Sequence, residues 1–156
     1  MVRSLDRLEL EVSRASCRLS AVGNPEETLT VLRGIPQGAV DGDVLLSAGK
    51  APHQTGQYDL SAVYYERALS SDDENGDTYF RLGTALLVAG RVGDSLKSLK
   101  RAVELNSSNV RAYRNLATAL AETGDTESEK ATYGEVLRLD STAQDREEDE
   151  RWIKEH

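Results

Sequence analysis

The residues that could do chemistry in this chain are few, and their spacing does not bring them together. There are two histidines, His53 and His156, and a single cysteine, Cys17. Catalysis of a group transfer or a hydrolysis needs a nucleophile, a base and an orienting group that converge, and no motif around His53 supplies them. We therefore expect no catalytic residue and no enzyme; a cryptic hydrolase is the least favoured hypothesis.

Sites for metals and cofactors are equally poorly supported. The pair Gly49-Lys50 superficially resembles part of a phosphate-binding loop, but that pattern requires an earlier glycine and a following serine or threonine, where Val44 and Ala51 stand. The acidic run at 72–74 lacks the spacing of a calcium-binding loop. One cysteine allows neither an intramolecular disulfide nor a thiolate cluster. We expect no metal and no cofactor.

Charge and hydropathy narrow the class of partner. The 156 residues carry a formal net charge of -8, and an acidic surface repels phosphate backbones, so we expect no nucleic acid partner. No apolar run approaches the roughly 18 residues that a membrane-spanning helix needs. The early charges Arg3 and Asp6 do not fit a signal peptide. With the single cysteine, these features predict a cytoplasmic protein without a membrane span.

Self-similarity at an offset of 34 residues is the strongest signal in the chain. The segments 42–75, 76–109 and 110–143 align without gaps, and similar residues recur in the same columns. Such columns hold Leu45, Tyr79 and Tyr113; Ala48, Leu82 and Leu116; Gly49, Gly83 and Ala117; Gly56, Gly90 and Gly124; Tyr65, Leu99 and Tyr133; and Ala68, Ala102 and Val136.

The elements that carry these columns are helices. Tyr79, Leu82 and Leu86 are spaced i, i+3 and i+7, which places them on one helix face. Gly83 is small and lets a partner helix come close. Gly90 follows, and glycine ends a helix readily because it adopts positive φ without a steric penalty. A second apolar stretch comes next, so each unit reads as helix, turn, helix.

This period and these columns resemble the tetratricopeptide repeat family over 42–143. The resemblance implies an all-α fold, a right-handed α-solenoid of helix-turn-helix tetratricopeptide repeats. We expect an N-terminal helix and a degenerate repeat within 1–41, three repeats at 42–143, and a C-terminal capping helix at 144–156.

Two departures from the repeat predict local distortions. Pro52 falls in the column of Leu86 and Leu120. Proline inside a helix removes a hydrogen bond, so we expect the first helix of 42–75 to be kinked or short. Glu129 stands where the other units have serine. An unpaired buried carboxylate is costly, so we expect the last helix pair to splay.

The two ends of the chain are expected to be helical. Apolar residues at 5–22 recur with the alternating three- and four-residue spacing of a coiled-coil seam, within a helix over 4–22. This helix either caps the first repeat, docks in the groove or forms a homodimer. A further helix is expected at 26–33 and a loop at 34–38. Near the other end, Trp152 is expected to pack on the last repeat as part of the cap.

A partner site follows from the resemblance. In proteins of the family, the first helices of successive units line a concave groove that reads a peptide or a partner helix. Carried over by position, the groove residues are Leu46, Lys50 and His53 from the first unit, Phe80, Arg81, Thr84 and Leu87 from the second, and Arg111, Arg114, Asn115 and Thr118 from the third.

This set is basic although the protein is acidic. Four of its members are cationic and none is a carboxylate, which suits an acidic or C-terminal segment, because arginine pairs well with carboxylates. Phe80 and Leu87 would add apolar contact. Asp77 and Glu122 flank the set and temper its potential. The alternative is that these are ordinary solvated helix residues.

Some members of the family clamp the C-terminal carboxylate of chaperone tails with lysine and asparagine. Here Leu46 and Lys50 replace the first such pair, and Arg81, Arg111 and Asn115 match the remainder only in part. A chaperone-tail adaptor is therefore not favoured.

We predict a non-enzymatic scaffold, adaptor or chaperone-like protein that holds a partner segment in its groove. The layout of a helix followed by about three repeats is also similar to that of type III secretion chaperones for translocator proteins and of pilus or secretion assembly factors. An alternative from another class is a structural protein that self-assembles into homo-oligomers.

Overall fold

The computed structural model describes residues 39–54, 56–70 and 74–140, together with residues 7, 10, 30, 33 and 34. Apart from those isolated positions, the expectations for the helices at 4–22 and 26–33, the loop at 34–38, Cys17 and the cap at 144–156 lie outside the described residues. The repeat region is described almost throughout.

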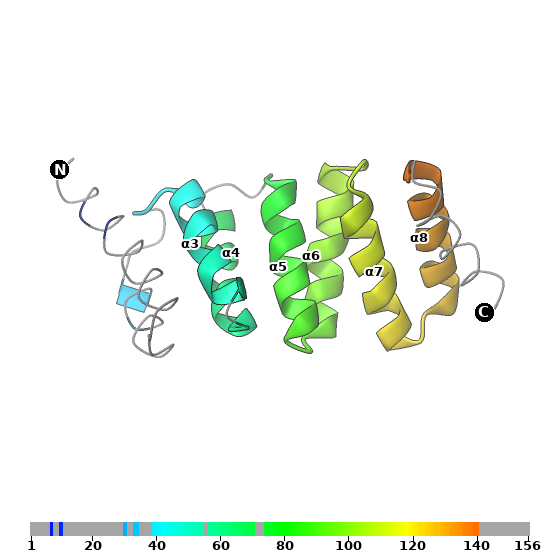
Figure 1. Ribbon diagram of the computed structural model, residues 1–156, viewed down its shortest axis with the longest axis horizontal. Coiled ribbons are helices and arrows are strands. Elements are labelled where there is room, and N and C mark those ends of the chain that lie inside the picture. Colours follow the sequence, from blue (N-terminus) through cyan, green and yellow to red (C-terminus); the bar gives the residue numbers. More distant parts are fainter. Residues whose placement is uncertain are drawn as a thin grey trace.

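The described chain folds into three successive helical hairpins (Figure 1). Their helices are α3 (Gly42–Gln54), α4 (Tyr58–Leu69), α5 (Gly76–Val88), α6 (Val92–Leu105), α7 (Val110–Thr123) and α8 (Thr126–Leu139). No strand occurs among the residues that the structure describes. The all-α, helix-turn-helix architecture predicted from the 34-residue offset is therefore confirmed.

Local sequence sets the limits of these helices. Gly56, Gly90 and Gly124 have φ of 79°, 77° and 76°, so the aligned glycine column supplies a left-handed residue to each intra-repeat turn. Two of the first helices begin at an asparagine N-cap, since Asn75 accepts a hydrogen bond from Thr78 N and Asn109 from Ala112 N. The helix caps and the glycine turns recur at the same positions of successive repeats, so the hairpins have the same limits.

Close approach of the two helices defines the first two hairpins. A Cβ atom on Gly49 would lie 2.6 Å from Tyr65 Cε1, and one on Gly83 would lie 2.6 Å from Leu99 Cγ. Each glycine also exposes its carbonyl to a buried serine: Ser61 Oγ donates to Gly49 O at 2.5 Å, and Ser95 Oγ donates to Gly83 O at 2.8 Å. Glycine and serine together therefore fix the distance between the paired helices.

The third hairpin lacks both features. Ala117 stands where the others have glycine, and its Cβ needs the room that Tyr65 and Leu99 fill elsewhere. Glu129 replaces the serine and is 6% exposed, yet an ionised carboxylate cannot donate to the carbonyl of Ala117. Accordingly, α8 buries two side chains where α6 buries four. The third hairpin is the most weakly packed of the three.

Pro52 does not shorten its helix. α3 has 13 residues, the same length as α5, so the predicted shortening is wrong. Pro52 lies in the last turn of α3, so the hydrogen bond that its missing N–H removes is followed by only two more helical residues, His53 and Gln54. Its side chain is fully buried, in the column where Leu86 and Leu120 are also buried. The ring thus replaces leucine as a core residue.

Stacking of hairpin on hairpin builds the core. Ala62 and Tyr65 of α4 pack against Leu82, Ala85 and Leu86 of α5. One step along, Leu99 and Ala102 of α6 belong to a cluster with four buried residues of α7. Because α4 and α6 are each held between their own partner helix and the next hairpin, α3, α5 and α7 follow one another along the long axis (Figure 1).

Replacing Glu129 by serine should stabilise the protein. The substitution restores the donor to the carbonyl of residue 117 and removes a buried carboxylate, so we expect the free energy of unfolding to rise by about 1 kcal/mol. Glu127→Ser, an exposed change on the same helix, is the control and should leave stability unchanged or slightly lower. Urea titration followed by circular dichroism measures both. Destabilisation by Glu129→Ser would show that the carboxylate supports the hairpin.

Two neighbouring tyrosines give a matched pair of stability tests. Burial raises the pKa of Tyr64 to about 12, and its buried hydroxyl has no hydrogen-bond partner among the residues that the structure describes. Burial also raises the pKa of Tyr65, opposed by side-chain hydrogen bonds with Ser61 and Arg81. Tyr64→Phe should therefore be neutral or stabilising by up to about 1 kcal/mol, and Tyr65→Phe should destabilise by about 1 kcal/mol. Thermal unfolding of both variants provides the measurement; the reverse order contradicts this assignment of partners.

Candidate partner-binding face

Each first helix presents one outward stripe. On α5, the stripe is Asp77, Arg81, Thr84 and Val88, spaced i, i+4, i+7 and i+11. The equivalent positions are Asp43, Ser47, Lys50 and Gln54 on α3, and Arg111, Asn115, Thr118 and Glu122 on α7. All twelve are exposed or half-buried. We call the surface that these three stripes form the α3–α5–α7 face.

Direct bonds join the stripes of α5 and α7. Asn115 Nδ2 donates to Thr84 Oγ1 at 2.8 Å, and Thr84 Oγ1 donates to the carbonyl of Phe80 at 2.8 Å. The guanidinium of Arg111 lies 5.3 Å from the centroid of the Phe80 ring, within range of a cation–π contact. Four predicted groove residues from two repeats are thus brought together.

Phe80 does not offer the apolar surface expected of it. Its side chain is 7% exposed and belongs to the buried cluster that contains Leu99 and Leu116. The prediction that Phe80 makes apolar contact with a partner is therefore corrected: its ring supports Arg111 from below. Leu46 and Leu87 are only half-buried, but both pack against the core clusters.

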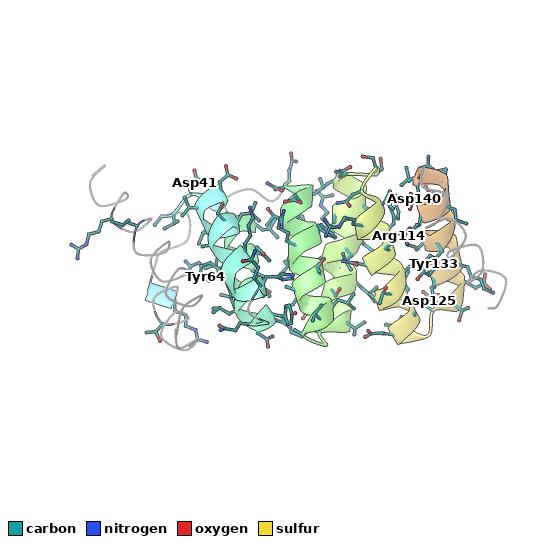
Figure 2. The ribbon with its side chains drawn as sticks, in the orientation of Figure 1. Asp41, Tyr64, Arg114, Asp125, Tyr133 and Asp140 are labelled. Carbon is teal, nitrogen blue, oxygen red and sulfur yellow. The ribbon has the colours of Figure 1, made fainter. Side chains whose placement is uncertain are left out.

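Two of the four predicted cations are already paired within the molecule. Arg81 Nε donates to Asp77 Oδ2 at 2.7 Å, and Arg114 Nη2 to Asp140 Oδ2 at 2.7 Å (Figure 2). Lys50 and Arg111 are exposed and form no ion pair with any residue that the structure describes. The face holds three cations, Lys50, Arg81 and Arg111, and three carboxylates, Asp43, Asp77 and Glu122, so its formal net charge is zero and its positive charge is only local.

The remaining predicted groove residues differ in availability. Thr118 is exposed, and its Oγ1 donates to the carbonyl of Arg114 at 3.0 Å, the back-bonding usual for threonine in a helix. His53 is half-buried at the end of α3, with its ring edge-on to Tyr58 at a centroid distance of 5.2 Å. Burial, and secondarily the charge of Arg81, lower the pKa of His53. His53 and Arg81 are therefore electrostatic neighbours across the first two repeats.

Sequence reasoning missed three residues that shape this face. Val88 is a large apolar side chain that is 55% exposed, and its spacing of i+4 from Thr84 could have revealed it. Asp77 was regarded only as a flanking charge, although its i, i+4 spacing to Arg81 is typical of a helical ion pair. Asp140 is 26 residues from Arg114 and has no sequence signal.

Other site chemistries find no support among the described residues. No group of three histidine, cysteine, aspartate or glutamate side chains in this part of the chain could hold a metal ion. Within the same residues, no helix has the length and apolar content that crossing a bilayer demands.

Three stacked hairpins whose first helices share one polar face define an α-helical repeat protein. The tetratricopeptide repeat family model matches residues 46–96 and 80–143. The chain belongs to the tetratricopeptide repeat family, as its 34-residue period predicted.

Solved structures of tetratricopeptide domains are similar in fold. The first such domain of Spaghetti (RPAP3), bound to the HSP90 peptide SRMEEVD, has a TM-score of 0.68 and 23% identity, covering 74% of this chain and 91% of that one. The Arabidopsis OM64 domain has a TM-score of 0.68 and 20% identity, covering 74% and 95%. MamA has a TM-score of 0.67 and 18% identity, covering 81% and 80%. At these identities, the likeness concerns the fold.

Curated relatives are much longer than this chain. A tetratricopeptide repeat and J domain-containing co-chaperone, DNJ1, of Fusarium oxysporum is 27% identical over 112 residues, which span 72% of this chain but 22% of the relative. The repeat-containing thioredoxin TTL4 of Arabidopsis thaliana is 28% identical over 88 residues, 56% of this chain and 13% of that protein. The similarity thus lies in a repeat portion of larger proteins.

The environment of His53 predicts a pH dependence of stability. Because its pKa is lowered in the folded protein, the unfolded chain binds a proton at higher pH than the folded one does. Stability is therefore retained above the ordinary value of 6.5 and is lost as the pH falls from there toward the lowered pKa. His53→Asn removes this contribution.

Comparing denaturant midpoints of wild type and His53→Asn at about pH 7.5 and about pH 5.5 isolates the effect. The carboxylates contribute equally to both proteins and cancel. We expect the wild type to lose more stability than the variant on acidification. Equal losses would mean that His53 titrates normally in the folded state.

Proposed function

We propose that this protein is a non-enzymatic protein–protein interaction module that holds a segment of another protein against the α3–α5–α7 face. It acts as a scaffold, adaptor or chaperone-like factor. The observation that carries the proposal is the face itself: three parallel stripes, two of them joined by the Asn115–Thr84 bond, present Lys50, Arg81 and Arg111 on one side of an acidic molecule.

Rigidity supports this use of the face. The core clusters hold the backbone of α5 and α7, and the Thr84–Asn115 bond ties their stripes together. A partner segment therefore meets a preformed surface, and binding does not have to order the receptor as well. Charge-assisted hydrogen bonds from arginine and lysine then favour acidic segments over basic ones.

The relatives point in the same direction. The Spaghetti domain is bound to an HSP90 peptide that contains two adjacent glutamates, and a curated relative is a co-chaperone. In the Spaghetti structure, this fold binds a segment of another protein, which is the role proposed here. The proposal does not extend to their J or thioredoxin domains, because this chain matches less than a quarter of either relative.

Site-specific photo-crosslinking tests the proposal. A photoreactive residue placed at Ser47 or Thr118, both exposed on the face, should capture the same partner from an extract of the native cells. The matched control is Lys97, which is on α6 and whose side chain is 83% exposed. We expect adducts from the two face positions, lost when Arg81→Ala and Arg111→Ala are combined, and none from position 97. Equal capture from Lys97, or none from the face, refutes the proposal.

A further inference from the structure

The connection between the first two repeats ends in a chemically reactive pair of residues. Asn75 precedes Gly76, and this is the single Asn-Gly pair in the 156 residues. The side-chain amide of an asparagine can be attacked at Cγ by the backbone nitrogen of the residue that follows. Glycine leaves that nitrogen unshielded because it has no Cβ, and asparagine is for its amide chemistry among the thermolabile residues of proteins.

We propose that Asn75–Gly76 is a site of spontaneous covalent modification. Gly76 N forms a bond to Asn75 Cγ, the C–N bond of the side-chain amide breaks, and ammonia leaves with the proton from Gly76 N. The product is a five-membered succinimide. Water then opens the ring, giving aspartate when it attacks Cγ and isoaspartate when it attacks the original main-chain carbonyl carbon. Water is the only other reactant, and the inference is independent of the proposed function.

The place of Gly76 in its helix leaves its nitrogen available. Gly76 is the first residue of α5, and the first four N–H groups of a helix have no carbonyl partner within it. Attack by Gly76 N therefore breaks no hydrogen bond of the helix. Asn75 and Gly76 are half-buried and Glu74 is exposed, so water reaches the ring that forms.

Helix packing explains why a glycine stands at this position. A Cβ atom on Gly76 would lie 3.2 Å from Leu105 Cβ and 3.6 Å from the carbonyl oxygen of Ala102. Both residues belong to the end of α6, which approaches the start of α5 closely. The packing of the second hairpin thus favours the residue that makes Asn75 reactive.

The helix cap slows the reaction without preventing it. Asn75 Oδ1 accepts a hydrogen bond from Thr78 N at 3.0 Å, and ψ of Asn75 is 97°. Ring closure requires a negative ψ, which brings Gly76 N to the side of Cβ, so the cap bond must open first. Helix ends open more easily than helix centres. We therefore expect the reaction to proceed through opening of the first turn of α5 and not through global unfolding.

The third repeat contains a matched control. Asn109 caps α7 in the same way, since its Oδ1 accepts from Ala112 N at 3.1 Å and its ψ is 87°. Asn109 is also half-buried. It is followed by Val110, whose β-branched side chain crowds its own backbone nitrogen. The two asparagines thus share column, cap and exposure, and differ in the residue that follows.

The two products have different effects on the helix. Asp41 occupies the same column in the first repeat, and its Oδ1 accepts from Asp43 N at 2.8 Å, so aspartate at position 75 keeps a capping oxygen. Isoaspartate instead routes the main chain through Cβ and leaves a carboxylate directly on Cα. That change disturbs both bonds that Asn75 accepts, from Thr78 N and from Tyr79 N. Isoaspartate therefore loosens the first turn of α5, at one end of the α3–α5–α7 face.

Ageing of the full-length protein at mildly alkaline pH tests the proposal. Peptide mapping by mass spectrometry, with detection of isoaspartate, follows each asparagine. We expect both products at position 75 and a rate at Asn109 that is at least about tenfold lower. A synthetic peptide of residues 70–80 should react about five- to tenfold faster than the protein, because no cap holds its asparagine.

Exchanging the following residues separates their effect from that of position. Gly76→Ala should slow the reaction of Asn75, and Val110→Gly should make Asn109 react about as fast as Asn75 does. Circular dichroism confirms that both variants are folded. Hydrogen exchange of the Thr78 and Tyr79 amides should be faster in the purified isoaspartate form, whereas Asn75→Asp should keep the exchange rates of the wild type.

Three results overturn the proposal. Equal rates at Asn75 and Asn109 mean that the following residue does not control the reaction. An intact Asn75 in the protein, after the free peptide has reacted fully, means that the cap closes the site. An unreactive Asn109 in folded Val110→Gly means that an Asn-Gly pair in this setting is inert.

Discussion

The bond from a buried serine to a glycine carbonyl is the contact on which the first two hairpins of this solenoid depend. Ser95 Oγ donates to Gly83 O only because the glycine has no Cβ and lets α6 approach α5 until Leu99 touches its backbone. A carbonyl within a helix keeps a second lone pair that the buried hydroxyl can use. One pair of small residues thus sets helix distance, satisfies a buried polar group and fixes the register of the hairpin.

The α3–α5–α7 face is a consequence of that register. When successive hairpins have the same internal geometry, their first helices repeat at a constant orientation, and residues 34 apart occupy equivalent positions. Three short stripes therefore become one two-dimensional surface.

Much of the fold could be predicted from the sequence because its signals are local and repeated. The 34-residue offset gave the hairpins, and the glycine column gave three turns with positive φ. The column method was less informative where one column holds different residue types. Leu46, Phe80 and Arg114 share a column, yet Phe80 is buried and Arg114 is paired with Asp140. The position of a residue within its repeat predicts which way its side chain points, whereas the size and polarity of the side chain decide how deeply it is buried.

The prediction that Pro52 shortens its helix was wrong for a related reason. The sequence argument weighed the lost hydrogen bond but not the place of the residue within its helix. In the last turn of α3 that loss has little effect on helix length, and the ring gains the burial that leucine has in the other repeats. The location of a helix end is a property of cap and turn, and the glycine column had already placed that end close to Pro52.

The ion pair between Arg114 and Asp140 offsets the weakness of the third hairpin. There, alanine and glutamate have replaced glycine and serine, so the serine-to-carbonyl bond is lost. Asp140 follows the last residue of α8, and its side chain is 10% exposed, which makes its pairing stronger than that of a fully solvated pair. It fastens the far end of α8 to the middle of α7. The same pairing engages one of the four cations that the sequence predicted for the groove.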